Sequence, residues 1–282
     1  YSTFVGSYKP IMTKVELRNH DGHVVVDDNN KVVKEPRITY KFVKQAFLKA
    51  YLAAWKKYSA GSLDKVEPQF LVIEEINRGN CAQIFGDLFQ LLDRSGNGFS
   101  SYSIEADADL QAEIENAFST DGEYKLENDL AIEGVVKNYV SNSGKTLSED
   151  VQSGRVLLLP KNLYIWATMN TSDQSLFPID SAFKRRWDWK YIKIADAGKG
   201  WMIKCGSEAC DWWKFVSEIN KNIAEETNSD DKKLGYFFCK PDKDDVVVSE
   251  EKFVGKVLFY LWNDVFKDGD TSIFKLDTST GE

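Results

Sequence analysis

The chain has 282 residues, of which 43% are hydrophobic and 28% charged, and its formal net charge is −8. These values are ordinary for a globular protein with one large domain or two. The acidic balance disfavours a primary nucleic-acid-binding module, which would need a basic face. No apolar run approaches the roughly 20 residues that span a bilayer, so we expect no membrane association. The four cysteines are scattered, which favours reduced thiols in a cytoplasmic protein over a zinc site.

The first sixty residues contain turn signals followed by a helical pattern. Asp21-Gly22 and Asn29-Asn30 lie on either side of Val24–Val26, which predicts a hairpin. Residues 40–59 carry apolar side chains at helical spacing with lysines on the other face. This pattern predicts an amphipathic helix.

The run Phe70–Ile73 predicts a short strand buried on both faces, and two carboxylates, Glu74 and Glu75, follow it directly. Ligands of open α/β sheets bind beyond the carboxyl ends of the strands. Two acids at that edge suit a hard cation and a water aligned on a phosphate. The alternative is a surface pair of glutamates that ends an ordinary strand. Residues 84–92 then show helical spacing and predict a helix that packs back on the sheet.

A second strand, Leu163–Ala167, also ends in small polar residues, among them Asn170. A helix-like segment, Ile179–Phe183, follows and is closed by Lys184-Arg185-Arg186. If the two strands are neighbours, they present their polar ends at one edge of the sheet. A metal-holding acid, a water-orienting acid, a polar sensor and an arginine finger are the components of phosphoryl transfer.

The remaining segments are an acidic insertion and a helical C-terminal region. Residues 94–155 are polar and acidic, and they are either an ordered excursion or a mobile flap; Asp107–Phe118 within them predicts a helix. The alternating segment Trp187–Ile194 predicts the last strand of the core. Beyond it, Asp211–Thr227 and Ser249–Phe266 carry apolar residues at helical spacing and predict a small helical domain.

Taken together, IEEINRGN (73–80), MNTSDQS (169–175) and AFKRRWD (182–188) resemble the AAA+ nucleotidase domain of McrB-type restriction proteins. The opening YSTFVGSYKP is similar to that family's aromatic strand segment, and KLGYFF (233–238) is similar to part of its C-terminal lid. Residues 96–155 take no part in the resemblance.

The resemblance implies roles for individual residues. Glu74 would hold Mg²⁺, and Glu75 would polarise the attacking water. Asn170 would contact the γ-phosphate or the water; a cap at the end of the strand is the alternative. Arg185 and Arg186 are both candidates for a finger that acts on the neighbouring subunit; a basic helix end that complements the helix dipole is the alternative. The site-shaping residues and the lid residues that would contact base or sugar are Asn77, Arg78, Asp173, Gly235 and Tyr236.

The chain departs from the family pattern in two ways. Gln174 follows the signature aspartate, where family members often carry arginine. No G-x-x-x-x-G-K-[ST] occurs in the sequence: Gly144-Lys145-Thr146 lacks the upstream glycine and the preceding strand. We therefore expect the phosphate-binding loop to lie upstream of Tyr1, and these residues alone to bind nucleotide weakly and to be inactive.

The sequence thus predicts an α/β AAA+ core without its P-loop at residues 1–195, with the insertion at about 94–155, and an α-helical lid at 196–282. The expected function is GTP or ATP hydrolysis with Mg²⁺ in a ring, expected to be hexameric, that drives a DNA-restriction complex. The expected partners are an McrC-like nuclease and DNA, the latter bound through a domain outside this chain. The alternative is a non-catalytic AAA+ scaffold.

Overall fold

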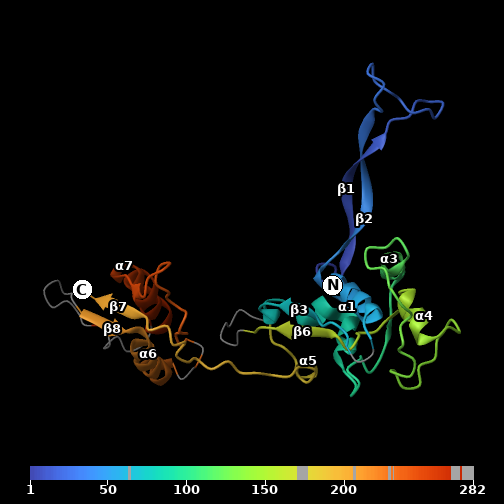
Figure 1. The fold of residues 1–282 in the computed structure, drawn as a ribbon. Helices are drawn as coiled ribbons and strands as arrows, with labels where there is room; N and C mark the ends of the chain where they lie inside the picture. The colour runs from blue at the N-terminus through green and yellow to red at the C-terminus, as the bar shows by residue number, and fades with distance from the viewer. Residues whose placement is uncertain are drawn as a thin grey trace. The chain divides into compact units, whose positions relative to one another are not determined.

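A computed structural model describes residues 1–62, 65–169, 177–205, 208–227, 230, 232–267 and 274 (Figure 1). The chain divides into two compact units. The first contains the described residues up to Asp188, and the second contains those from Trp189 onward. The sequence had placed this boundary after residue 195.

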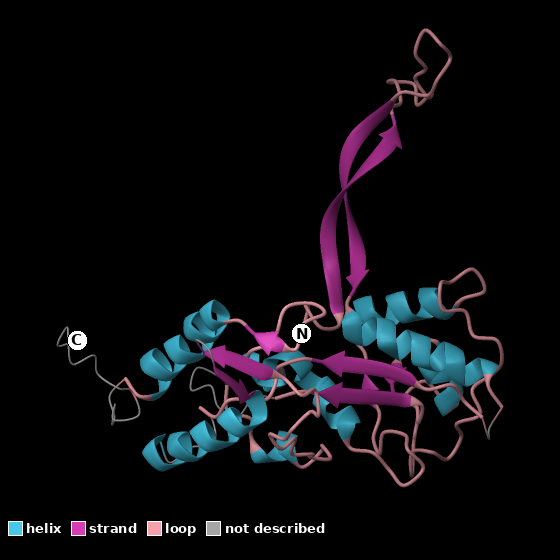
Figure 2. Cartoon of the chain, turned by 60° about the vertical axis from the view of Figure 1, so that its left-hand side comes forward, coloured by secondary structure: helices cyan, strands magenta, loops and turns pink. Residues whose placement is uncertain are grey.

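A long antiparallel hairpin opens the first unit. Strands β1 (Gly6–Glu16) and β2 (Lys34–Lys44) pair along their whole length, and two turns with isolated bridges continue the ribbon (Figures 1 and 2). The two predicted turns around Val24–Val26 are therefore confirmed, whereas the long pairing of β1 with β2 was not predicted. The predicted helix begins later than expected, because residues 40–44 pair with β1 and α1 spans Ala46–Ala60. Strand pairing outweighs the helical spacing of these five residues.

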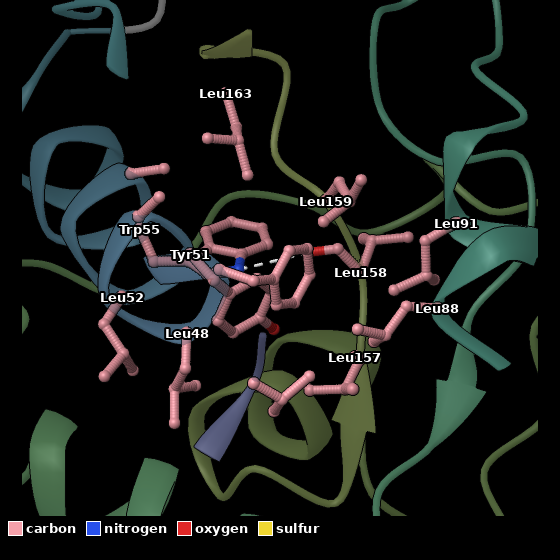
Figure 3. Packing of buried hydrophobic residues seen from close by; sticks show 14 of the residues in the cluster. Leu48, Tyr51, Leu52, Trp55, Leu88, Leu91, Leu157, Leu158, Leu159 and Leu163 are labelled. Carbon is pink, nitrogen blue, oxygen red and sulfur yellow. Dashed lines mark hydrogen bonds between the residues drawn. The ribbon is translucent and has the colours of Figure 1, made fainter. Parts of the chain in front are cut away.

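The core of this unit lies around α1. The helix buries Leu48, Tyr51 and Trp55, which face Leu157–Leu159 and Leu88 in Figure 3. The Trp55 indole Nε1–H donates a hydrogen bond of 3.2 Å to the Leu158 carbonyl (Figure 3). A buried aromatic side chain thus adds its apolar area to the core without leaving its polar atom unpaired.

Strands β3 (Gln69–Ile73) and β6 (Leu163–Ala167) form a parallel pair. Their adjacency confirms the expectation that the two motif-bearing strands are neighbours. Leu71 and Leu163 are buried on the side where α1 packs, whereas Val72 is 58% and Trp166 is 61% exposed. The prediction of a strand buried on both faces is wrong, because the described residues cover only one face of the pair.

Short helices follow both strands. Beyond β3 lie the 3-10 turn η1 (Ile76–Arg78), α2 (Cys81–Phe85) and the 3-10 helix η2 (Gly86–Leu92). The predicted helical segment is thus confirmed, although most of it is 3-10 rather than α. The segment before the basic cluster forms α5 (Ser181–Lys184), whose Phe183 is buried.

The acidic insertion is an ordered part of the first unit. Its elements are β4 (Ile104–Glu105), α3 (Ala108–Phe118), α4 (Leu147–Gln152) and β5 (Val156–Leu157), with β4 and β5 antiparallel. Ile114, Ile132 and Val151 are fully buried in the same core as α1. Of the two alternatives, the ordered excursion is therefore correct. Thr146 caps α4 through a capping box, so Gly144-Lys145-Thr146 serves as a helix start.

The second unit is mixed α/β. Its elements are β7 (Met202–Cys205), β8 (Glu208–Asp211), α6 (Trp212–Thr227), β9 (Val247–Val248) and α7 (Glu250–Phe253), which continues into the π-helical turns η3 (Val254–Leu258) and η4 (Leu261–Val265). Both predicted helices are confirmed, whereas the sheet β8-β7-β9 was not predicted.

The segment Trp187–Ile194 is not a strand. Tyr191 and Ile192 are 72% and 75% exposed, and no described residue pairs with this segment in a ladder. Alternation favours an extended backbone, but a strand also needs a partner. The helices of the described ranges include none that is both long and apolar enough to cross a membrane.

Candidate active site

The site begins with a strained residue at the end of β3. Glu75 has φ 51° and ψ 53°, the left-handed region, which costs a non-glycine residue about 1–2 kcal/mol. Its backbone N–H donates a 3.0 Å hydrogen bond to Thr168 Oγ1, and the Ile76 N–H donates one of 2.9 Å to the Thr168 carbonyl. The Thr168 N–H in turn donates to the Ile73 carbonyl at 2.9 Å. The ends of β3 and β6 thus hold the strained turn in place.

The Glu75 carboxylate forms an ion pair with Arg78 one turn later. Both side chains are accessible, with Glu75 at 50% and Arg78 at 68% exposure. Asn77, between them, is buried, and its carbonyl accepts a 3.0 Å hydrogen bond from the Phe177 N–H. The motif residues therefore form one connected turn that presents acids to solvent at the edge of the sheet.

The donor set of this turn suits a cation that arrives with phosphates. Glu74 and Glu75 are adjacent and exposed, but no group of three or more His, Cys, Asp or Glu side chains with metal-site spacing occurs within the described ranges. Mg²⁺ in nucleotide enzymes is commonly held by one or two carboxylates, waters and the substrate phosphates. The residues present fit such a shared site and do not fit a closed protein cage.

The two candidate finger residues have different surroundings. The side chain of Arg186 is 7% exposed: its Nη2 lies 2.7 Å from Asp93 Oδ2, its Nη1 donates to the Ala182 carbonyl at 2.7 Å, and its guanidinium lies 3.9 Å from the Phe89 ring centroid. Arg185, at the end of α5, is exposed. Arg186 is thus engaged within its own unit, whereas Arg185 is accessible.

Four predicted site residues lie outside the part of the first unit that the structure describes. Asn170 and Asp173 lie outside the described residues. Gly235 and Tyr236 belong to the second unit, where Tyr236 is buried. The Tyr236 carbonyl accepts a 2.6 Å hydrogen bond from Trp212 Nε1, and its hydroxyl accepts one of 3.3 Å from the Lys199 N–H. Tyr236 therefore has a clear packing role in its own unit.

The chain is 32% identical over 288 aligned residues to the type II restriction enzyme BsuMI component YdiS of Bacillus subtilis (strain 168). The alignment covers 99% of this chain and 71% of the relative. The chain belongs to the YdiS family. No protein-family model matches it.

Sequence reasoning missed a partly buried arginine that holds the start of strand β6. Arg94 donates hydrogen bonds of 2.9–3.2 Å to four carbonyls, those of Gly98, Leu159, Pro160 and Leu163. Burial lowers the pKa of its guanidinium to about 10. Arg94 thereby fixes the start of β6, and its neighbour Asp93 pairs with Arg186. The Asp-Arg pair directly after the apolar run 84–92 was the available signal.

Proposed function

We propose that this chain is the nucleotide-hydrolysing subunit of a DNA-restriction complex and acts on ATP or GTP with Mg²⁺. The observation that carries the proposal is the left-handed Glu75, held at the end of a parallel strand pair beside a second exposed carboxylate. Strained residues that persist in a fold cluster at functional sites. Membership of a family whose relative is named a restriction-enzyme component supports the restriction role.

Within this proposal the two glutamates have separate tasks. Glu75 accepts a hydrogen bond from the attacking water and polarises it toward the γ-phosphate. Arg78 restricts the carboxylate of Glu75 through their ion pair. Glu74 would hold Mg²⁺, which supplies charge neutralisation of the phosphates when it is bound with nucleotide. Thr168 acts through Glu75, because its hydroxyl fixes the Glu75 backbone.

The geometry favours Arg185 as the finger that reaches a neighbouring subunit. A finger must be free to contact the nucleotide of another copy, and Arg185 is exposed at the end of α5. Arg186 would have to break an ion pair, a carbonyl hydrogen bond and a ring contact to do the same. We assign Arg186 to positioning α5. Asn170, Asp173, Gly235 and Tyr236 keep the roles that the family resemblance implies.

A non-catalytic scaffold of the same complex is the second candidate, because these 282 residues contain no P-loop motif. Phosphate release by the full-length protein with ATP or GTP and Mg²⁺ separates the two. The nucleotidase proposal expects hydrolysis of at least one nucleotide. Absence of both binding and hydrolysis, together with intact restriction of unmodified plasmid DNA in cells, would establish the scaffold instead.

The restriction role is tested independently of nucleotide chemistry. Deletion of the gene should raise the transformation efficiency of unmodified plasmid DNA, and the wild-type gene should restore the barrier. The same assay compares two variants, Glu75→Gln and its matched control Glu225→Gln. The control changes a glutamate at an exposed position of α6 in the same way. Unchanged efficiency in the deletion strain would remove the restriction role.

A further inference from the structure

The β1–β2 hairpin presents an apolar strip that its own unit does not cover. Directly opposed residues of an antiparallel pair lie on the same face, and Met12 is opposite Ile38 as Pro10 is opposite Tyr40. Met12, Ile38 and Tyr40 are 76%, 65% and 70% exposed. Contiguous exposed apolar side chains on this scale mark interaction surfaces.

The hairpin is also basic in an acidic chain. Its two strands carry six basic residues and two acidic ones, a net charge of +4 against −8 for the whole chain. The basic residues are Lys9, Lys14, Lys34, Arg37, Lys41 and Lys44. Lys44, at the base, already pairs with Glu113 of the acidic insertion at 2.6 Å. The other five lie farther out along the ribbon.

An isolated two-stranded ribbon is only marginally stable in water. Each strand has 11 residues, which corresponds to an arm of about 35 Å at the usual rise of an antiparallel strand. The two strands extend away from α1 in both views of the chain (Figures 1 and 2). Such an arm is long enough to contact another molecule, and its own unit leaves its apolar side chains uncovered. Both features are expected of a segment that mediates assembly.

The complementary surface is present on the same chain. Residues 104–154 contain twelve acidic and three basic residues. A pocket of about 290 Å³ in this insertion is lined in part by Tyr102, Glu105 and Val140. Tyr102 is 62% and Val140 is 82% exposed, so the pocket has exposed apolar side chains at its rim. Its lining is balanced in charge, with Glu105 and Asp150 beside Lys137 and Arg155, and the acidic excess lies in the rest of the insertion.

We propose that the hairpin of one copy docks on the acidic insertion of a second copy, with the Met12–Ile38–Tyr40 strip against the pocket around Tyr102 and Val140. The lysines of the hairpin then face the carboxylates of the insertion. The contact covers the apolar strip of one chain and offsets the acidic charge of the other. This inference does not depend on nucleotide hydrolysis.

DNA is the competing occupant, because a two-stranded ribbon fits the major groove. Two observations favour protein. The central exposed side chains are apolar, and both arginines of the ribbon, Arg18 and Arg37, already pair with Glu16 and Glu35.

A photocrosslinking amino acid in place of Tyr40 tests the contact in the full-length protein. Tagged and untagged copies are mixed, with and without unmodified duplex DNA and nucleotide, and the products are mapped by mass spectrometry. The proposal expects crosslinks between copies within residues 102–105 and 136–142. Crosslinks to DNA, to another polypeptide or to a different surface of the second copy, or the absence of any crosslink, would overturn it.

Charge-reversal variants test the same contact quantitatively. Lys14→Glu with Lys34→Glu should weaken self-association at least about tenfold in sedimentation. Lys214→Glu with Lys221→Glu, an equal charge change on exposed positions of α6, should leave it within about twofold. Adding Glu105→Lys to the hairpin variant should restore part of the loss. If the two pairs of substitutions weaken self-association equally, the effect comes from net charge alone, and the proposal is contradicted.

Discussion

The backbone N–H of Glu75 donates a 3.0 Å hydrogen bond to the hydroxyl of Thr168, a residue 93 positions later in the chain. This bond is one of three that join the end of β3 and the turn after it to Thr168, directly after β6. It stabilises a left-handed backbone at the residue to which we assign water activation. The strain at Glu75 and the proposed chemistry can therefore be separated by substitution.

Glu75→Gly should raise the free energy of unfolding of the first unit by up to about 1 kcal/mol, because glycine adopts the left-handed region without the Cβ penalty. The same variant should lose hydrolysis. Urea unfolding and phosphate release measure the two effects. Glu74→Gly is the control: it should not gain stability, since Glu74 is not among the residues with positive φ. Equal stability changes in both variants would contradict the strain argument.

Thr168→Val removes the hydroxyl but keeps the shape of the side chain. Because the Glu75 N–H then loses its acceptor, we expect a loss of about 1 kcal/mol in unfolding free energy and slower hydrolysis at unchanged nucleotide affinity. Thr168→Ser should restore both. If valine and serine behave alike, the hydroxyl has no positioning role.

Substitution of Arg186 should lower stability, whereas substitution of Arg185 should slow hydrolysis. Arg186→Ala removes the Asp93 ion pair and the Phe89 ring contact, so it should lower unfolding free energy by about 1–3 kcal/mol. Arg185→Ala should leave stability within about 0.5 kcal/mol and slow hydrolysis by 10³-fold or more, as loss of an arginine finger does. Thermal unfolding and phosphate release distinguish the two. The reverse pattern would transfer the finger role to Arg186.

Asp150 should make the insertion sensitive to acid. Its fully buried carboxylate accepts hydrogen bonds from Ser141, from Tyr139 at 2.6 Å and from Ser143 at 3.0 Å. Burial opposes its charged form, but these bonds and the charge of Arg155 outweigh burial and lower its pKa. The stabilisation is therefore present above the unfolded pKa of about 3.9 and is lost as pH falls through the lower folded pKa.

Asp150→Asn should accordingly cost about 2–3 kcal/mol at pH 7, and the difference from wild type should shrink below about pH 4. Asp129→Asn, at an exposed position of the same insertion, is the control. Unfolding followed from pH 7 to pH 2 tests this. A difference between Asp150→Asn and wild type that stays constant with pH would show that the carboxylate charge does not matter.

Local patterns predicted the elements whose neighbours lie close in the sequence. The turns around Val24–Val26, α3 and α6 followed from apolar runs and turn residues. The adjacency of β3 and β6, whose paired residues lie 94 positions apart, was expected only because both apolar runs end in polar residues. The errors came from long-range pairing. Tyr40 has helical spacing with its successors but pairs with Pro10, and Tyr191 alternates with its neighbours yet is 72% exposed.

The candidate site was predictable in part. The exposed position of Glu74 and Glu75 at a strand end followed from the abrupt change from apolar to acidic residues. The left-handed turn at Glu75 and the support from Thr168 did not, because a glutamate carries no signal for positive φ. The distinction between Arg185 and Arg186 needed the positions of Asp93 and Phe89, which adjacent basic residues cannot reveal.

The central claim is that Glu75 activates water for nucleotide hydrolysis. The most direct measurement is phosphate release by full-length Glu75→Gln beside wild type, with nucleotide affinity measured in parallel and Glu225→Gln as the control. We predict a fall of at least about 100-fold in turnover with affinity within about threefold of wild type. Wild-type turnover in the Glu75→Gln variant would contradict the account.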